Sequence, residues 1–238
     1  MENSFSDLIE GHFFLDFETN KKGDFYLAGF TSAGKFHQVV LTPKLQGVAT
    51  ELEIKLVRPK DFAIEFLEGV RAHRGTIVAY STAEQNTLKA LLSGEEELLN
   101  SVQYCNLAKA ARMWVRKYKQ REFDSLPPLV KSADDFSKKR HPKSLASICR
   151  LIGFDAPADY AIGKTTSRFN TVINALEKRN QDYSSLTAVQ KAKATKAIKH
   201  NRYDVEGMIE LFSVIRKADP KIIGRASSPL LRNDTEQD

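Results

Sequence analysis

Two acidic residues near the N-terminus have the spacing of a metal-binding pair. Asp16 and Glu18 occur in LDFET, directly after the apolar run FFL. Residues two apart on a strand point to the same face, so both carboxylates can converge on one cation. An isolated D-x-E is common, and a solvated strand end is its usual explanation. The apolar run places this pair at the margin of a buried strand, where an unpaired charge is costly, and that favours a functional role.

Two further acids and one histidine belong to expected helices. Glu84 falls in the first turn of a helix that follows the β-rich run TIVAY, where it would serve equally well as a partner of the helix dipole. Asp204 lies in HNRYDVEGMIELF, and His200, four residues earlier, shares its helix face. Such a His/Asp pair alone is usually a surface interaction. Together, however, the four acids come from three separate elements.

This combination of residue types suits metal-dependent phosphoryl transfer to water. Mg²⁺ prefers oxygen ligands, and two such ions about 4 Å apart can activate the attacking water and stabilise the leaving oxygen. His200 is a candidate general base, because an unperturbed imidazole titrates near neutral pH. We therefore expect Asp16, Glu18, Glu84 and Asp204 to bind two Mg²⁺ or Mn²⁺ ions.

The order and context of these residues resemble the DEDD superfamily of metal-dependent 3′–5′ exonucleases, which have a ribonuclease-H-like fold. Within it, the chain is most similar to the bacterial YprB-type predicted nucleases. FFLDFET, IVAYSTAEQNTLKALL and HNRYDVEGMIELF resemble the three motifs that carry the metal ligands. DFYLAGF resembles the strand after the first motif, which commonly ends in a glycine such as Gly29, and KSLASICRLIGF resembles a helix midway along the family. The resemblance covers roughly residues 12–216.

The resemblance implies a metal-dependent nuclease, in which His200 acts on the water and the four acids hold the ions. Two departures from the family pattern are visible. Glu84 stands where most of the superfamily has aspartate, and His200 precedes Asp204 by four residues, whereas the histidine branch has five. Two alternatives therefore stay open. One is a catalytically inactive nucleic-acid-binding module on the same fold, and the other is a structure-selective endonuclease.

The charge distribution points to a polyanionic partner. The net charge is +6, but residues 1–100 carry 15 acidic against 10 basic residues and residues 101–238 carry 15 against 26. Within 109–143, basic residues alternate with Trp114, Tyr118 and Phe123, which suits phosphate contacts and base stacking in single-stranded nucleic acid or at a 3′ end. The alternative interpretation is that this segment is a solvated loop that contacts no nucleic acid. The residues expected to contact nucleic acid are Arg112, Arg116, Lys117, Lys139, Arg140 and Lys164.

Composition and patterning predict one α/β domain over residues 1–217. We expect a ribonuclease-H-like mixed sheet of about five strands flanked by helices, with a helical C-terminal part. Ala33-Gly34 should close a hairpin, and a capping box of Thr187 and Gln190 should begin the long last helix. Cys105 and Cys149 are expected to be core residues. A basic loop insertion is expected at about 118–142, and residues 218–238 are expected to be a disordered tail. Two cysteines in 238 residues exclude a disulfide scaffold, and no secretory signal or membrane-spanning run is present, so a cytoplasmic protein is expected.

Overall fold

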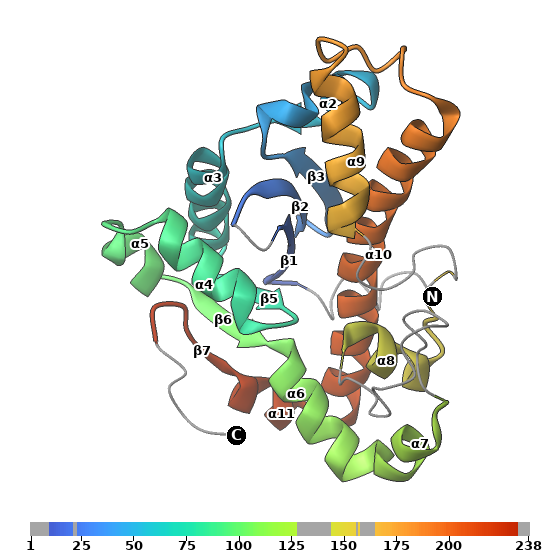
Figure 1. Cartoon of the computed structure of the whole chain (residues 1–238). Coiled ribbons are helices and arrows are strands. Elements are labelled where there is room, and N and C mark those ends of the chain that lie inside the picture. Colours follow the sequence, from blue (N-terminus) through green and yellow to red (C-terminus); the bar gives the residue numbers. More distant parts are fainter. Residues whose placement is uncertain (1–9, 21–22, 128–143, 156, 158–164, 233–238) are drawn as a thin grey trace.

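The structure is a computed structural model, and it describes residues 10–20, 23–127, 144–155, 157 and 165–232 (Figure 1). Its centre is a seven-stranded mixed sheet with the strand order β4-β3-β2-β1-β5-β6-β7. β1, β2 and β3 pair antiparallel, whereas β5 and β6 continue the sheet parallel to β1. The strands are β1 (His12–Thr19), β2 (Phe25–Ser32), β3 (Lys35–Val40), β4 (Lys55–Leu56), β5 (Thr76–Ala79), β6 (Gln103–Asn106) and β7 (Ser227–Pro229).

Helices cover both faces of this sheet, so the α/β class with a helical C-terminal part is confirmed (Figure 1). Two short strands that the sequence did not reveal, β4 and β7, add to the five expected. The α-helices are α2 (Gln46–Glu51), α3 (Pro59–Ala72), α4 (Thr82–Leu91), α5 (Glu96–Asn100), α6 (Leu107–Trp114), α7 (Gln120–Ser125), α8 (Leu145–Cys149), α9 (Thr165–Glu177), α10 (Ala188–Ala218) and α11 (Pro220–Ala226).

The hairpin between β2 and β3 follows from its two turn residues. Ala33 and Gly34 have φ angles of 49° and 73°. Positive φ at both central residues is the requirement of a two-residue turn whose twist matches that of the flanking strands. The predicted Ala33-Gly34 hairpin is therefore confirmed, and it fixes the register Ser32–Lys35 between β2 and β3.

The sheet is buried between distinct apolar clusters. On one face, Phe13, Leu15 and Phe17 of β1 pack with Phe62 and Phe66 of α3, and α4 and α5 extend this cluster. On the other face, Phe14 of β1 packs in a cluster with α6, α8, α10 and α11. A third cluster joins β2 and β3 to α2, α9 and the first half of α10. The strand β1 is thus covered by helices on both sides.

The long helix α10 begins where the sequence predicts. The Thr187 side chain accepts a hydrogen bond from the Gln190 backbone N–H, and the Gln190 side chain accepts one from the Thr187 N–H. This capping box satisfies two backbone donors at the helix start. The helix then runs across β1 and β2 and brings residues 200–204 over the sheet.

Two segments that were expected to be irregular form regular helix and strand where the structure describes them. Both expectations are therefore wrong for the described residues. Residues 115–119 form a π-helical turn that leads into α7, instead of a loop beginning near 118. Residues 220–229 form α11 and β7, instead of a disordered tail, and β7 pairs antiparallel with β6. The physical reason is apolar burial, because Ile222, Ile223 and Leu230 all lie in the core. In the described part of the chain, the helices are too short or too polar to cross a bilayer.

Candidate metal centre

Three elements bring the predicted acids to one edge of the sheet. β1 and β5 are parallel, with Phe14 opposite Val78, so their C-terminal ends lie together. Asp16 and Glu18 lie near the C-terminal end of β1, and Glu84 lies in the first turn of α4, just after β5. His200 and Asp204 come from α10, which packs against β1. We call Asp16, Glu18, Glu84 and Asp204 the acidic cluster.

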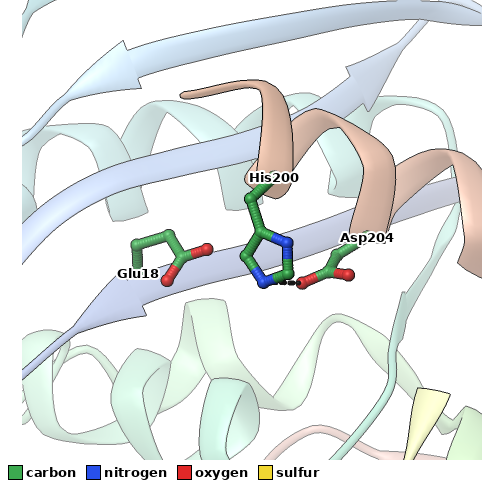
Figure 2. Close-up of side chains that lie close together, drawn as sticks. All are labelled: Glu18, His200 and Asp204. Carbon is green, nitrogen blue, oxygen red and sulfur yellow. Dashed lines mark ion pairs between the residues drawn. The ribbon is translucent and has the colours of Figure 1, made fainter. Parts of the chain in front are cut away.

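Glu18, His200 and Asp204 form the tightest part of this site. One ligand atom from each of the three side chains lies within 4.8 Å of the other two, which is a candidate metal-binding arrangement. Nε2 of His200 is 3.4 Å from Oδ2 of Asp204. Figure 2 shows the Glu18 carboxylate on one side of the imidazole and Asp204 on the other. These residues therefore converge from β1 and α10, as expected from sequence.

The acidic cluster is electrostatically coupled as well as close. Burial raises the pKa of Glu18 well above its ordinary value, and the charges of Asp16, Asp204 and Glu84 raise it further. Burial likewise raises the pKa of Asp204, with added repulsion from Asp16 and Glu84. Desolvation and like charges both disfavour the ionised form of a carboxyl group. The site thus concentrates negative charge that a bound cation would offset.

Asp16 is held by an asparagine from α10. Burial raises the pKa of Asp16 to about 6, and a hydrogen bond from Asn201 opposes that rise. The amide Nδ2 of Asn201 lies 2.7 Å from Oδ2 of Asp16 and 3.2 Å from the Asp16 backbone oxygen. A carboxylate that accepts hydrogen bonds is stabilised in its charged form. Asn201 therefore supports the acid that the sequence places at the centre of the motif.

Glu84 has two roles in the structure. The Ser81 hydroxyl accepts a hydrogen bond from the Ala83 N–H at 3.0 Å and donates one to Oε2 of Glu84 at 2.9 Å, so both residues belong to the start of α4. Burial, together with the negative charge of Asp16, raises the pKa of Glu84 to about 7, so the carboxyl lies within electrostatic reach of the acidic cluster. The helix-start interpretation and the cluster interpretation are therefore both supported.

The expectation that His200 has a pKa near neutrality is wrong for this structure. Burial, together with the positive charge of Arg168, lowers the pKa of His200 to about 4. The imidazole is therefore neutral at physiological pH. A neutral ring nitrogen can accept a proton or bind a metal, so the lower pKa is compatible with either role.

Sequence reasoning missed three residues that complete the site. Arg168 of α9 is 8% exposed and carries a positive charge close to His200. Asn201 is fully buried, and Gln38 of β3 donates to it at 2.8 Å. The one sequence signal was a polar side chain, Asn201, on the expected inner side of an amphipathic helix. Nothing local marked Arg168 or Gln38.

The residues expected to contact nucleic acid are only partly described. Arg112 is half-buried and its charge acts on the hydroxyl of the partly buried Tyr80, just after β5. Arg116 is exposed, and Lys117 forms an ion pair of 2.8 Å with Asp219. Lys139, Arg140 and Lys164 lie outside the described residues.

The expected aromatic stacking surface is largely absent from the described part of this segment. Trp114 is 2% exposed and Phe123 is 6% exposed, and both pack in the core beside α6. Tyr118 is 43% exposed and is the one of the three that could stack on a base. The spacing of aromatics in the sequence reflected an amphipathic helix, because the helix buries the apolar members and exposes the cations.

The cysteines have the buried, structural environment that the sequence favours. Cys105 of β6 and Cys149 of α8 are both free and fully buried. Burial raises the pKa of Cys105 to about 11 and that of Cys149 to about 12. Thiols with such pKa values are poor nucleophiles at neutral pH, so neither cysteine is a candidate nucleophile.

Comparison with known proteins adds no assignment to this geometry. No family model matches the chain, and neither a curated protein nor a solved structure shows significant similarity to it.

Proposed function

We propose that this protein is a metal-dependent nuclease that hydrolyses phosphodiester bonds in nucleic acid. The observation that carries the proposal is the convergence of Glu18, His200 and Asp204, each with a ligand atom within 4.8 Å of the other two, next to the half-buried Asp16 and the buried Glu84. Folding gains nothing from bringing like charges together in a poorly solvated place. A cation that binds there would turn this repulsion into favourable coordination.

The donor set fits Mg²⁺ or Mn²⁺. Carboxylate oxygens suit both ions, and a single imidazole is acceptable to Mn²⁺ in particular. Glu18, His200 and Asp204 would form the nearest ligand group, and Asp16 and Glu84 would complete the coordination. When bound, two such ions supply Lewis-acid stabilisation and lower the pKa of an attacking water.

The protein's own groups have definite tasks in such a site. His200 is neutral at physiological pH, so its Nε2, next to Asp204, can accept a proton or ligate. Asn201 holds the Asp16 carboxylate in place. Arg168 adds a buried positive charge beside His200, and arginine is the side chain best suited to bind a phosphate oxygen in a poorly solvated pocket.

Three considerations favour nucleic acid and an exonucleolytic reaction. The chain has a net charge of +6, with the basic excess in residues 101–238. The sheet, in which an antiparallel β3-β2-β1 is followed by the parallel strands β5 and β6, is compatible with a ribonuclease-H-like fold. The motif resemblance supplies the 3′–5′ direction, and no described surface bears on it independently.

The decisive experiment uses the full chain with end-labelled single-stranded DNA and RNA oligonucleotides. We expect a ladder shortened from the 3′ end in Mn²⁺ or Mg²⁺ and no product in excess chelator. Asp204→Asn, purified in parallel, should lower the rate by roughly a thousandfold, about 4 kcal/mol of activation free energy. It also controls for a contaminating nuclease.

Other products would change the assignment in defined ways. A single internal cut would replace the exonuclease with a structure-selective endonuclease. Salt-sensitive binding that survives chelation, without product, would indicate a nucleic-acid-binding module. Full activity of the Asp204→Asn variant would remove the acidic cluster from the chemistry altogether.

A further inference from the structure

Asn201 is the most completely enclosed polar side chain next to the acidic cluster. It follows His200 in α10 and has no exposed surface. Its amide contacts three different strands: β1 through Asp16, β3 through Gln38 and β2 through Gly29. A buried amide must have its hydrogen bonds satisfied, so its orientation is fixed by these neighbours.

One backbone carbonyl oxygen determines which atoms of the Gln38 and Asn201 amides donate hydrogen bonds and which accept them. Nε2 of Gln38 is 3.0 Å from the carbonyl oxygen of Ile198, which can only accept, so this atom is the amide nitrogen. Its second N–H points to Oδ1 of Asn201 at 2.8 Å. The Asn201 nitrogen must then face Asp16, where its two N–H groups reach Oδ2 and the backbone oxygen. Both amide groups therefore use both donors.

The packing at Gly29 leaves no freedom for this arrangement. A β-carbon at Gly29 would lie 2.2 Å from Oδ1 of Asn201 and 2.8 Å from its Cγ. Both distances are far inside van der Waals contact. Gly29 lies within β2, which runs to Ser32, rather than at the strand end that the sequence suggested. Glycine is needed because the asparagine occupies the place of a side chain.

We infer that Asn201 is a positioning residue that holds the Asp16 carboxylate by its Oδ2 and leaves Oδ1 as the oxygen offered to a cation. Gln38 and Gly29 act through it, the first by orienting the amide and the second by making room. This inference rests on the proposed function, because it assigns Asn201 a part in the same metal site. Residues that orient a ligand in this way typically change metal affinity by about 10–100-fold when removed.

The test measures Mn²⁺ binding directly, without substrate, by electron paramagnetic resonance of the free ion. Asn201→Ala should raise the dissociation constant for Mn²⁺ by about 10–100-fold. The hydrolysis rate at saturating Mn²⁺ should fall less than the rate at limiting Mn²⁺. Ser213→Ala is the matched control, because Ser213 is a buried polar residue of the same helix, three turns away from the site. It should leave Mn²⁺ binding unchanged.

Gly29 provides a second, independent variant. Gly29→Ala should weaken Mn²⁺ binding as Asn201→Ala does, because the new methyl group displaces the amide. In the Asn201→Ala background the obstructed atoms are gone, so adding Gly29→Ala should cause no further loss. This non-additive pattern distinguishes positioning through Asn201 from general damage to the sheet. It also provides the test if the Asn201→Ala chain alone is poorly folded.

The outcomes separate this inference from the proposed function. If the wild-type protein binds Mn²⁺ and cuts nucleic acid, and a folded Asn201→Ala variant does both equally well at limiting Mn²⁺, the positioning role is wrong and the nuclease stands. Independent, additive losses for Gly29→Ala and Asn201→Ala would also overturn it. If the wild-type protein neither binds Mn²⁺ nor yields product, the proposed function itself is wrong and the inference falls with it.

Discussion

The two faces of β1 differ in chemistry although they are formed by alternate residues of one strand. Phe13, Leu15 and Phe17 point into the apolar cluster with α3, α4 and α5. Phe14 points the other way into the cluster with α10, but the next two positions on that face are Asp16 and Glu18. Both acids are half-buried, and the raised pKa values of their carboxyl groups correspond to an electrostatic cost of ionising them in the folded chain.

This difference separates the part of the strand that stabilises the fold from the part that serves chemistry. A fully buried leucine contributes roughly 2–3 kcal/mol through removal of apolar surface from water. A buried carboxyl group whose pKa is raised is instead destabilising when ionised. Substitutions on the two faces should therefore change stability in opposite directions, and this can be measured on neighbouring residues.

The largest effect is expected on the apolar face. Leu15→Ala should lower the free energy of unfolding by about 3 kcal/mol, because Leu15 is fully buried and its removal leaves a cavity. For a chain of this size that corresponds to a melting temperature lower by roughly 6–12 °C. Thermal unfolding followed by circular dichroism measures it. A loss below about 1 kcal/mol would show that this face of β1 is loosely packed.

A smaller effect of opposite sign is expected on the acidic face. Asp16 has an ordinary pKa of 3.8 and a folded-state pKa of about 6. Between these values the folded chain holds the proton more tightly than the unfolded chain, so the carboxyl group costs stability as pH rises through this window. In chelator, Asp16→Asn should therefore be more stable than wild type at pH 8 by about 2 kcal/mol, less than the full value of this pKa difference because the side chain is only half-buried, with little difference near pH 4. The asparagine oxygen can still accept from Asn201.

The control for this prediction is the metal. With saturating Mn²⁺ at pH 8 the order should reverse, because the wild-type carboxylate gains a cation and the amide does not. Melting temperatures with and without Mn²⁺ at pH 4 and pH 8 test both statements. A stability difference between the two proteins that does not change with pH would mean that Asp16 ionises normally and that the two faces of β1 are not opposed.

The sequence predicted the acidic face because its information is local. Alternation on a strand places Asp16 and Glu18 together, and helical spacing places His200 and Asp204 on one face, so each pair follows from a single element. The capping box at Thr187 and the Ala33-Gly34 turn were predictable for the same reason. That the pairs meet was suggested by the motif resemblance, and the structure brings them together.

Features that depend on distant packing were not predictable. Asn201 makes its contacts with residues on three strands, 163 to 185 positions away for its hydrogen bonds. Its place on the inner side of an amphipathic helix was a local signal, but that signal does not identify these partners. The C-terminal segment has Pro220, Gly224 and Pro229, which resemble a tail, but α4 holds it in place: Nε2 of Gln85 donates to the carbonyl oxygen of Leu230 at 2.8 Å. The lowered pKa of His200 likewise depends on burial by the folded chain and on the charge of Arg168 from another helix.

The smallest effect is the loss of the N-cap hydroxyl of α4, and it serves to test whether Glu84 belongs to the acidic face or only to the start of this helix. Ser81→Ala removes the N-cap hydroxyl and should lower the free energy of unfolding by about 1 kcal/mol at any pH. Glu84→Gln keeps an acceptor for Ser81 but removes a charge whose pKa lies at about 7 in the folded chain, against an ordinary 4.5. The folded state holds that proton more tightly, so the charge costs stability as pH rises from 4.5 to 7. If Glu84 faces the cluster, Glu84→Gln in chelator should stabilise the protein at pH 8, whereas Ser81→Ala should destabilise it. If both variants are destabilised equally, Glu84 belongs only to the start of α4 and is not a ligand of the proposed metal site.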